Sequence, residues 1–189
     1  MRNLIFAAGL AIYSSAASAN EFESQIRQYI SQEVMNWASE QVLIDAILAQ
    51  NSTTSGLSND EVLDLDLAWR AELDAVNRPT ISPVISNPAA IFLQSRVQES
   101  EGAISEVFLM DVRGLNVAAS SVTSDYWQGD EGKFQNTFLE GAGAIFIDEI
   151  EYDDSTQTYL AQVSLTVSDP SSGLPIGAMT IGLNAESLF

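Results

Sequence analysis

The spacing of hydrophobic residues changes once along the chain, from a helical period in the first half to an extended, alternating period in the second. Residues 21–49 contain no glycine or proline, and apolar side chains recur there at roughly every third or fourth position. This pattern predicts one helix, roughly 40 Å long at 1.5 Å per residue. A helix of that length either runs along a whole face of the domain or contributes to a dimer.

Two shorter helices are predicted next. Ser58 and Glu61 form a capping box, in which the serine caps the helix and the glutamate reaches back to it. Pro79 and Pro83 end this helix, and Pro88, which suits a first helical position, opens the following one. The inner stripe of the capped helix is predicted to consist of Val62, Leu65, Trp69, Leu73 and Val76.

After Gly102 the pattern favours a sheet. Five strands are predicted, at residues 106–111, 115–120, 145–152, 158–167 and 176–184. A short helix is predicted at 132–140, and turns at 153–156 and at Asp169–Gly173. Short connections favour antiparallel pairing. The fold class is therefore α+β: a five-stranded antiparallel sheet with the long N-terminal helix packed across one face.

The first nineteen residues have the pattern of a signal peptide. A short basic start is followed by ten apolar residues, Leu4 to Tyr13, and by the small-residue motif Ala17-Ser18-Ala19. Ten apolar residues are too few to span a bilayer, which needs about 20. We therefore expect a signal peptide at 1–19, a single domain at 20–189, and secretion to the periplasm.

Composition removes several classes of function. The chain has no cysteine and no histidine, so disulfides and the Ser-His-Asp and Cys-His catalytic systems are excluded, and zinc or copper is not expected. Its formal net charge of −19 disfavours nucleic acid and anionic lipid as partners. We expect a protein that is not an enzyme and that uses no cofactor. The acidity itself is most simply explained by solubility.

The stretch from Thr123 to Lys133 is the most distinctive local feature. It holds Tyr126 and Trp127 side by side, three acids, an amide and the single lysine of the chain, between two predicted strands. Loops present side chains on a rigid scaffold and often carry function. We interpret this stretch as the wall of a small-molecule pocket.

The order of these elements resembles the Cache family of extracytoplasmic sensor domains, also described as PDC or PAS-like, over residues 22 to 187. The similarity rests on the long first helix and on the hairpin 107–120, with its turn from Asp111 to Gly114. It also rests on the Tyr-Trp segment and on the closing segment 173–182. This resemblance implies a pocket between the sheet and the loops after the second strand. It also implies a small polar ligand such as an amino acid, an amine or a carboxylate.

The chain departs from the family pattern in two ways. Cache domains usually sit between transmembrane helices and feed a kinase, cyclase or chemoreceptor, and no such segment is recognised after the leader. We therefore expect a separate membrane-bound sensor kinase or chemoreceptor as partner. In addition, no arginine lies near Tyr126 and Trp127, where amino-acid-binding members hold the ligand carboxylate; the nearest cation is Lys133.

Each candidate residue has a structural alternative. Trp127 and Tyr126 can stack on a ligand or form a hydrophobic plug. Asp130 can accept from a ligand amine or cap the helix that follows it. Lys133 can hold a carboxylate or form a surface salt bridge.

The predicted ligand-binding set is completed by two residues of the later strands. It comprises Tyr126, Trp127, Asp130, Lys133, Asp148 and Tyr159. For Asp148, ordinary solvent exposure is the simpler interpretation. The acidic clusters lack the ligand spacing of a calcium loop, so no metal site is predicted. Two functions stay open: a periplasmic sensor domain that binds a small metabolite, and a module that docks on a sensor kinase without a ligand of its own.

Overall fold

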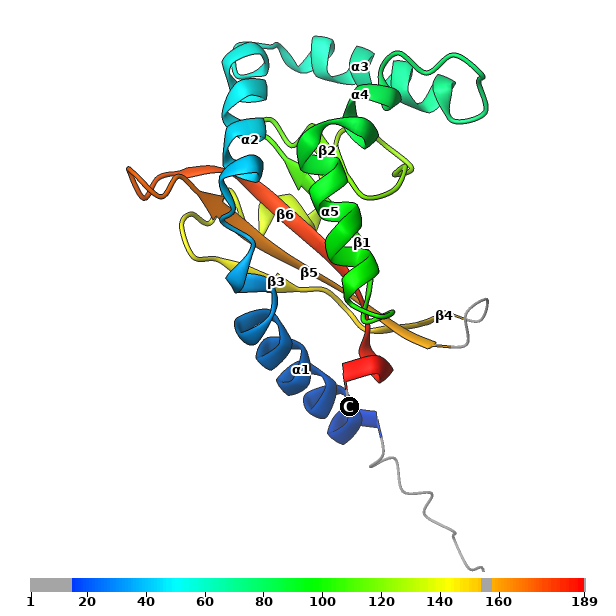
Figure 1. Ribbon diagram of the computed structural model, residues 1–189, viewed down its shortest axis with the longest axis vertical. Coiled ribbons are helices and arrows are strands. Elements are labelled where there is room, and N and C mark those ends of the chain that lie inside the picture. The colour runs from blue at the N-terminus through cyan, green and yellow to red at the C-terminus, as the bar shows by residue number, and fades with distance from the viewer. Residues whose placement is uncertain (1–14, 154–157, 189) are drawn as a thin grey trace, which may run out of the picture.

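The computed structural model describes residues 15–153 and 158–188. Helices and sheet form an α+β arrangement, with most of the helices before the first strand in sequence (Figure 1). The helical elements are α1 (Ser15–Gln32), η1 (Val34–Asn36), α2 (Gln41–Thr54), α3 (Asn59–Glu72), α4 (Ile81–Ser86), α5 (Pro88–Glu99), α6 (Gly132–Gln135) and η2 (Ala185–Leu188). The strands are β1 (Ile104–Met110), β2 (Asn116–Ala119), β3 (Ile145–Ile147), β4 (Glu151–Asp153), β5 (Thr158–Ser168) and β6 (Pro175–Asn184).

The strands form one antiparallel sheet, as predicted. Five of them follow the order β2-β1-β6-β5-β3, and β4 is a sixth strand that pairs with β5. The predicted strand at 145–152 is therefore two short strands, β3 and β4, which pair with different parts of β5. The predicted helix at 132–140 is reduced to α6. Part of the turn predicted at 153–156 lies outside the described residues.

The prediction of one continuous helix at 21–49 is wrong. The chain breaks between α1 and α2, and Glu40 has an extended backbone with φ −58° and ψ 140°. The side chains of Val34, Trp37 and Ala38 in this break are buried. Packing of this apolar group into the core outweighs helix propensity here, since propensity differs by less than about 1 kcal/mol between ordinary residues.

The local signals at α3 and α5 are confirmed. Ser58 and Glu61 form both bonds of the capping box at α3. The Asn87 side chain accepts from the backbone N–H of Ala90 at 2.8 Å and caps α5, with Pro88 at its first position. Pro83 does not end a helix, because it lies in the first turn of α4, where its missing N–H costs little. Val76 lies beyond the end of α3 and is fully exposed, contrary to the predicted stripe.

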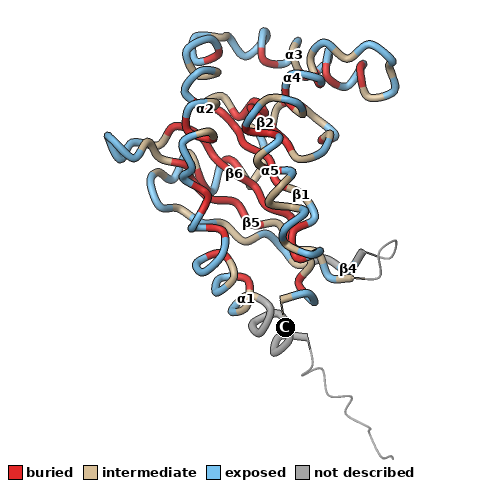
Figure 2. The backbone as a smooth tube through the Cα atoms, viewed as in Figure 1, coloured by how far each residue is buried: buried red, intermediate tan, exposed pale blue. Residues whose placement is uncertain are grey.

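Two cores lie on opposite faces of the sheet. The helix-side core packs α1, α2 and α5 against alternate residues of β1, β5 and β6, including Leu109, Val163 and Ile181. The buried strands run through the middle of the molecule in Figure 2. The loop-side core consists of Val62, Trp69, Ile81, Val84, Phe108, Met110, Leu115, Ala119, Tyr126, Phe134 and Ala178. The predicted pocket segment therefore packs on the loop side.

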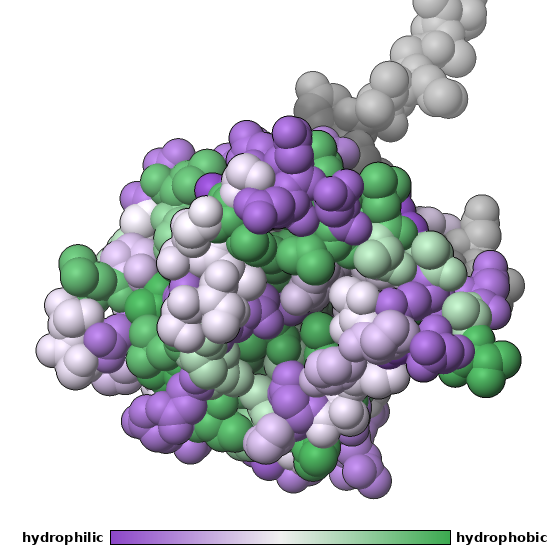
Figure 3. Space-filling view, turned by 90° about the horizontal axis from the view of Figure 1, so that it is seen from above, coloured by the Kyte–Doolittle hydropathy of each residue, from purple (hydrophilic) through white to green (hydrophobic). Residues whose placement is uncertain are grey.

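Seen from above, hydrophobic and hydrophilic residues are interspersed over the surface (Figure 3). None of the helices in residues 15–153 and 158–188 has both the length and the apolar content needed to cross a bilayer. Most of the predicted signal peptide lies outside the described residues, and its last residues, 15–19, belong to α1.

Candidate functional site

Tyr126 is part of the loop-side core. Its ring stacks on that of Trp69 of α3, with centroids 5.2 Å apart and planes 7° from parallel. Burial, together with the nearby charge of Asp111, raises the pKa of the Tyr126 hydroxyl to about 12. This packing matches the alternative of a hydrophobic plug. Contact of Tyr126 with a ligand stays a prediction.

Three side chains of α3 hold the segment that contains Tyr126. The buried carboxylate of Asp66 accepts from the backbone N–H groups of Tyr126 and Trp127 at 2.9 and 3.1 Å. The indole N–H of Trp69 donates to the carbonyl of Thr123 at 2.9 Å. Arg70 pairs with Asp66 at 2.7 Å and with Asp125 at 3.2 Å. These bonds fix the backbone of the segment against α3.

Trp127 closes the segment against the β1–β2 turn. Its indole N–H donates to the Arg113 carbonyl at 2.8 Å. Gly114 and Gly129 make this approach possible: a Cβ on Gly114, whose φ is +79°, would lie 2.6 Å from the Cα of Gly129. The only N–H of the indole is therefore bonded within the fold.

Asp130 is exposed, and α6 begins after Glu131, so Asp130 is not its N-cap. Lys133 is more buried than Asp130, with 13% of its side chain exposed. Its ammonium pairs with Glu131 at 2.9 Å and lies 5.4 Å from the centre of the Phe108 ring. Lys133 therefore forms the salt bridge that was the structural alternative to holding a ligand carboxylate, and its partner Glu131 belongs to the same stretch of chain.

Lys133 also acts on Glu106, which the sequence did not single out. Burial raises the pKa of the Glu106 carboxyl, and the charge of Lys133 and a bond from Gln162 at 3.4 Å partly offset this effect. The sequence could not identify Glu106 as a buried carboxylate. A polar residue between core residues of a strand gives the same sequence pattern whether its side chain is exposed or buried.

Asp148 lies between β3 and β4, and Tyr159 lies on β5. Asp148 is exposed and lines a cavity of about 350 Å³ with Glu149 and Gln162. Tyr159 packs edge-on against Tyr152, with ring centroids 5.1 Å apart. The six predicted residues are therefore divided between the segment after β2 and the strands β3 to β5, and the structure does not gather them around one cavity.

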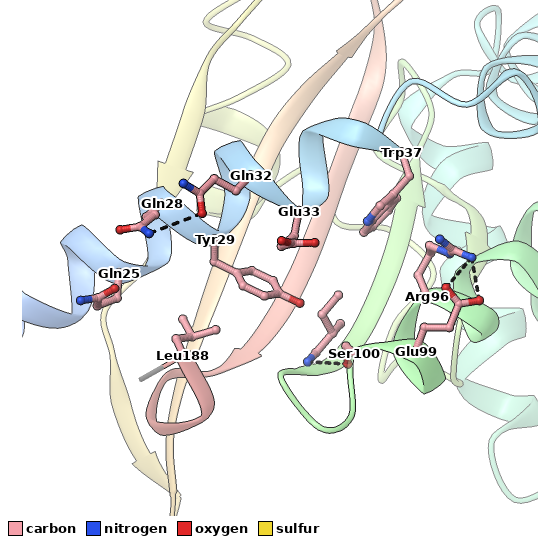
Figure 4. Close-up of a pocket in the computed structure, with 11 residues that line it drawn as sticks. Gln25, Gln28, Tyr29, Gln32, Glu33, Trp37, Arg96, Glu99, Ser100 and Leu188 are labelled. Atoms are coloured by element: carbon pink, nitrogen blue, oxygen red, sulfur yellow. Dashed lines mark hydrogen bonds and ion pairs between the residues drawn. The ribbon is translucent and has the colours of Figure 1, made fainter.

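A cavity of about 430 Å³ lies on the helix side of the sheet, between α1 and α5 (Figure 4). Below we refer to it as the α1/α5 cavity. It is lined by Gln25, Gln28, Tyr29, Gln32, Glu33, Trp37, Arg96, Glu99, Ser100, Ile104 and Leu188. The lining joins the first helical region, the end of α5, the start of β1 and the C-terminal η2.

The polar groups of the α1/α5 cavity differ in how far they are bonded within the protein. Arg96 pairs with Glu99 at 2.6 Å, and its Nε is buried with no partner among the described residues. The ring of Tyr29 extends from α1 across the cavity, beside Glu33 (Figure 4). Burial first, and then the charge of Glu33, raises the pKa of the Tyr29 hydroxyl. The cavity can therefore offer a ligand both hydrogen-bond donors and hydrogen-bond acceptors.

The sequence held a weak signal for this cavity. Gln25, Gln28 and Gln32 are spaced by three and four residues, which places them on one face of a helix. A glutamine stripe more often marks a solvated helix face than a site. The partner wall, at Arg96 and Glu99, comes from a helix about 70 residues away in sequence, and only the fold brings the two together.

No family model matches the chain, and no curated protein is similar to it in sequence. Several solved structures with some similarity to this chain are described as sensor or ligand-binding domains. The sensor domain of the V. cholerae histidine kinase DctB is 14% identical with a TM-score of 0.40, covering 93% of this chain and 59% of that one. The ligand-binding domain of the Campylobacter jejuni chemoreceptor Tlp3 in complex with L-valine is 14% identical with a TM-score of 0.41, covering 95% and 66%.

A third similar structure is the ligand-binding domain of the Pseudomonas aeruginosa PAO1 amino acid chemoreceptor PctC in complex with GABA. It is 14% identical with a TM-score of 0.41, covering 82% of this chain and 63% of that one. The chain thus spans less than two thirds of the length of each of these structures. At this identity and overlap, no ligand and no residue role is transferred from them.

Proposed function

We propose that the chain is a periplasmic sensor domain that binds a small polar metabolite in the α1/α5 cavity and does not catalyse a reaction. The observation that carries the proposal is the cavity itself. Its volume of about 430 Å³ lies within the range of small-molecule sites, roughly 300–1,000 Å³. Amide, hydroxyl, carboxylate and guanidinium groups from two helices face it, which suits an amino acid, an amine or a carboxylate.

The position of the cavity suits a sensor. Tyr29 lies on the first helix and Leu188 near the end of the chain, and both line the cavity. A ligand that contacts both sides links α1 to the C-terminal η2. Binding would then change how firmly α1 and η2 are held together, and a separate membrane-bound kinase or chemoreceptor could read this change.

Thermal-shift titration against amino acids, amines and carboxylates tests the proposal. A ligand that binds only the native state raises the unfolding midpoint progressively with its concentration. Tyr29→Phe and Gln32→Ala should reduce this rise. Gln98→Ala, an exposed glutamine of α5 outside the cavity lining, should leave it intact and serves as the matched control.

The same titration separates the α1/α5 cavity from the predicted aromatic site. If Lys133→Gln or Trp127→Phe removes the rise while Tyr29→Phe does not, the ligand binds on the loop side of the sheet. Tyr126, Trp127, Asp130 and Lys133 would then be the residues to test for contact with the ligand. No rise with any of the three ligand classes would contradict binding at either place.

A docking module is the second candidate function, and one groove favours it. The groove, of about 710 Å³, runs along α2 and the start of α5, with Val42, Ala46 and Val117 among its walls. Gln50, which also lines it, already donates to Asp111 at 2.9 Å. An apolar groove whose polar groups are bonded within the fold suits a protein segment better than a polar metabolite. Ala46→Glu should abolish partner binding and leave a metabolite-induced shift unchanged if the groove docks a kinase.

A further inference from the structure

The charges that line the α1/α5 cavity are not balanced. Three charged side chains contribute to its walls: the carboxylates of Glu33 and Glu99 and the guanidinium of Arg96. Two negative charges and one positive charge leave a formal charge of −1. Among the described residues, the rest of the lining is uncharged at neutral pH. A ligand that brings one positive charge therefore neutralises the site.

The one cation of the lining is already engaged. Nη2 of Arg96 lies 2.7 and 2.6 Å from the two carboxylate oxygens of Glu99, as the dashed lines of Figure 4 show. The guanidinium carbon lies 5.1 Å from the centre of the Phe92 ring. A ligand carboxylate that bonds to the remaining Nε would lie beside Glu99, and like charges repel each other. Arg96 is therefore better suited to donate to a neutral oxygen than to hold a carboxylate.

Glu33, in contrast, has no cation as partner. Within residues 15–153 and 158–188, every ion pair joins a cation to an acid other than Glu33. Its carboxylate lies beside the ring of Tyr29 (Figure 4). Burial and, second to it, the charge of Glu33 raise the pKa of the Tyr29 hydroxyl, so the carboxylate acts on a group inside the cavity. Glu33 is thus the acid of the lining whose charge the fold leaves uncompensated.

Apolar side chains complete the walls. Trp37, Ile104 and Leu188 line the cavity together with the ring of Tyr29. An ammonium group on an aliphatic or aromatic body can place its charge at Glu33 and its body against these side chains. The net charge of −19 also raises the concentration of cations near the protein and lowers that of anions.

Resting on the function proposed for the α1/α5 cavity, we propose that its ligand is a primary amine with an apolar body and no carboxylate. The ammonium group pairs with Glu33, and the apolar body packs against Trp37, Ile104 and Leu188. With the amine bound, the formal charge of the site is zero. The carboxylate of an amino acid would add a negative charge that no free cation of the lining balances. Glu33 therefore determines the charge specificity of the cavity.

Compounds that share a body and differ only in charge test the proposal. Phenylalanine is compared with phenethylamine, which lacks its carboxylate, and with hydrocinnamate, which lacks its amino group. Leucine is compared in the same way with isoamylamine and isocaproate. Calorimetric titration of the wild-type protein should show each amine binding at least about fivefold more tightly than its amino acid, and the acids binding most weakly. Added salt should weaken the binding of the amines by screening the charge of Glu33.

Glu33→Gln tests the residue itself. It should weaken the binding of both amines by about fivefold and should not weaken that of the acids. Glu40→Gln removes the same charge at an exposed position outside the lining and is the matched control, which should leave amine binding unchanged. Amino acids that bind as tightly as the matching amines overturn this inference and leave the proposed function standing. Amine binding that Glu33→Gln does not weaken also overturns it, and failure of every compound to bind overturns both.

Discussion

In the segment 123–128, backbone and side-chain groups are bonded to α3 or to the β1–β2 turn, and Tyr126 is stacked and buried. In the α1/α5 cavity, Tyr29 and the glutamines face an open space, and a buried guanidinium nitrogen has no partner among the described residues. Both regions hold aromatic and polar residues close together. They differ in how far the fold completes the hydrogen bonds: the backbone of the segment is bonded within the fold, although Gln128 Oε1 there is also buried without a partner among the described residues.

This difference separates residues that stabilise the fold from residues that are available to a ligand. A buried group that is already bonded contributes to stability and loses free energy if a ligand displaces its partner. An unbonded group at a cavity wall gains a bond when a ligand arrives. We therefore expect substitutions in the segment 123–128 and its α3 contacts to affect folding, and substitutions in the cavity to affect binding.

The largest effect is expected at Trp69. Trp69→Ala should lower the free energy of unfolding by about 3–5 kcal/mol, because it leaves a cavity in the loop-side core and removes the bond to Thr123. Urea unfolding followed by circular dichroism measures the loss. A loss below about 1 kcal/mol would show that α3 does not hold the segment 123–128 in place.

A smaller loss is expected from Asp66→Asn. The substitution keeps the shape of the side chain but removes the negative charge of the carboxylate. That carboxylate accepts hydrogen bonds from two backbone N–H groups and pairs with Arg70. Bonds to charged groups contribute about 1.5–3 kcal/mol, so a loss of that order is expected in the same unfolding assay. Asp64→Asn, at an exposed position of the same helix, is the control and should change stability by less than about 0.5 kcal/mol.

The sequence predicts what is locally encoded. The capping box at Ser58, the Asn87 cap of α5 and the turn ending at Gly173 each depend on residues a few positions apart, and each is found in the structure. The antiparallel sheet follows from strand periodicity in the same way. The break between α1 and α2 could not be predicted locally, because it depends on where Trp37 packs. The ring of Trp37 packs against that of Phe92 of α5, with ring centroids 6.2 Å apart.

The site was harder to predict for the same reason. Tyr126 and Trp127 are conspicuous in the sequence, but their stacking and bonding partners, Trp69 and Arg113, come from elements distant in sequence. The two walls of the α1/α5 cavity likewise meet only in the folded chain. Composition identifies residues that are able to bind a ligand, whereas the fold determines which of their groups are still unbonded.

Alkaline titration probes the segment 123–128 without displacing its backbone. The pKa of Tyr126 is raised to about 12 in the folded protein, against about 10 for an unperturbed tyrosine. Between these values the unfolded chain has lost the proton that the native chain keeps, so stability falls as pH rises above about 10 and is unaffected by this group below it. Tyr126→Phe should flatten this decline, as seen in unfolding midpoints from pH 9 to 12. An unchanged decline would mean that Tyr126 is not protected.

The smallest effects on stability are expected in the α1/α5 cavity. Glu33 and Gln28 are exposed, and Gln28 bonds only weakly to Gln32, at 3.4 Å. Glu33→Gln and Gln28→Ala should each change the free energy of unfolding by no more than about 0.5 kcal/mol without ligand, as is usual for surface positions. Urea unfolding of each variant, beside Asp66→Asn as reference, measures this. A loss as large as that of Asp66→Asn would show that these groups are part of the fold, and the contrast between the two regions would then fail.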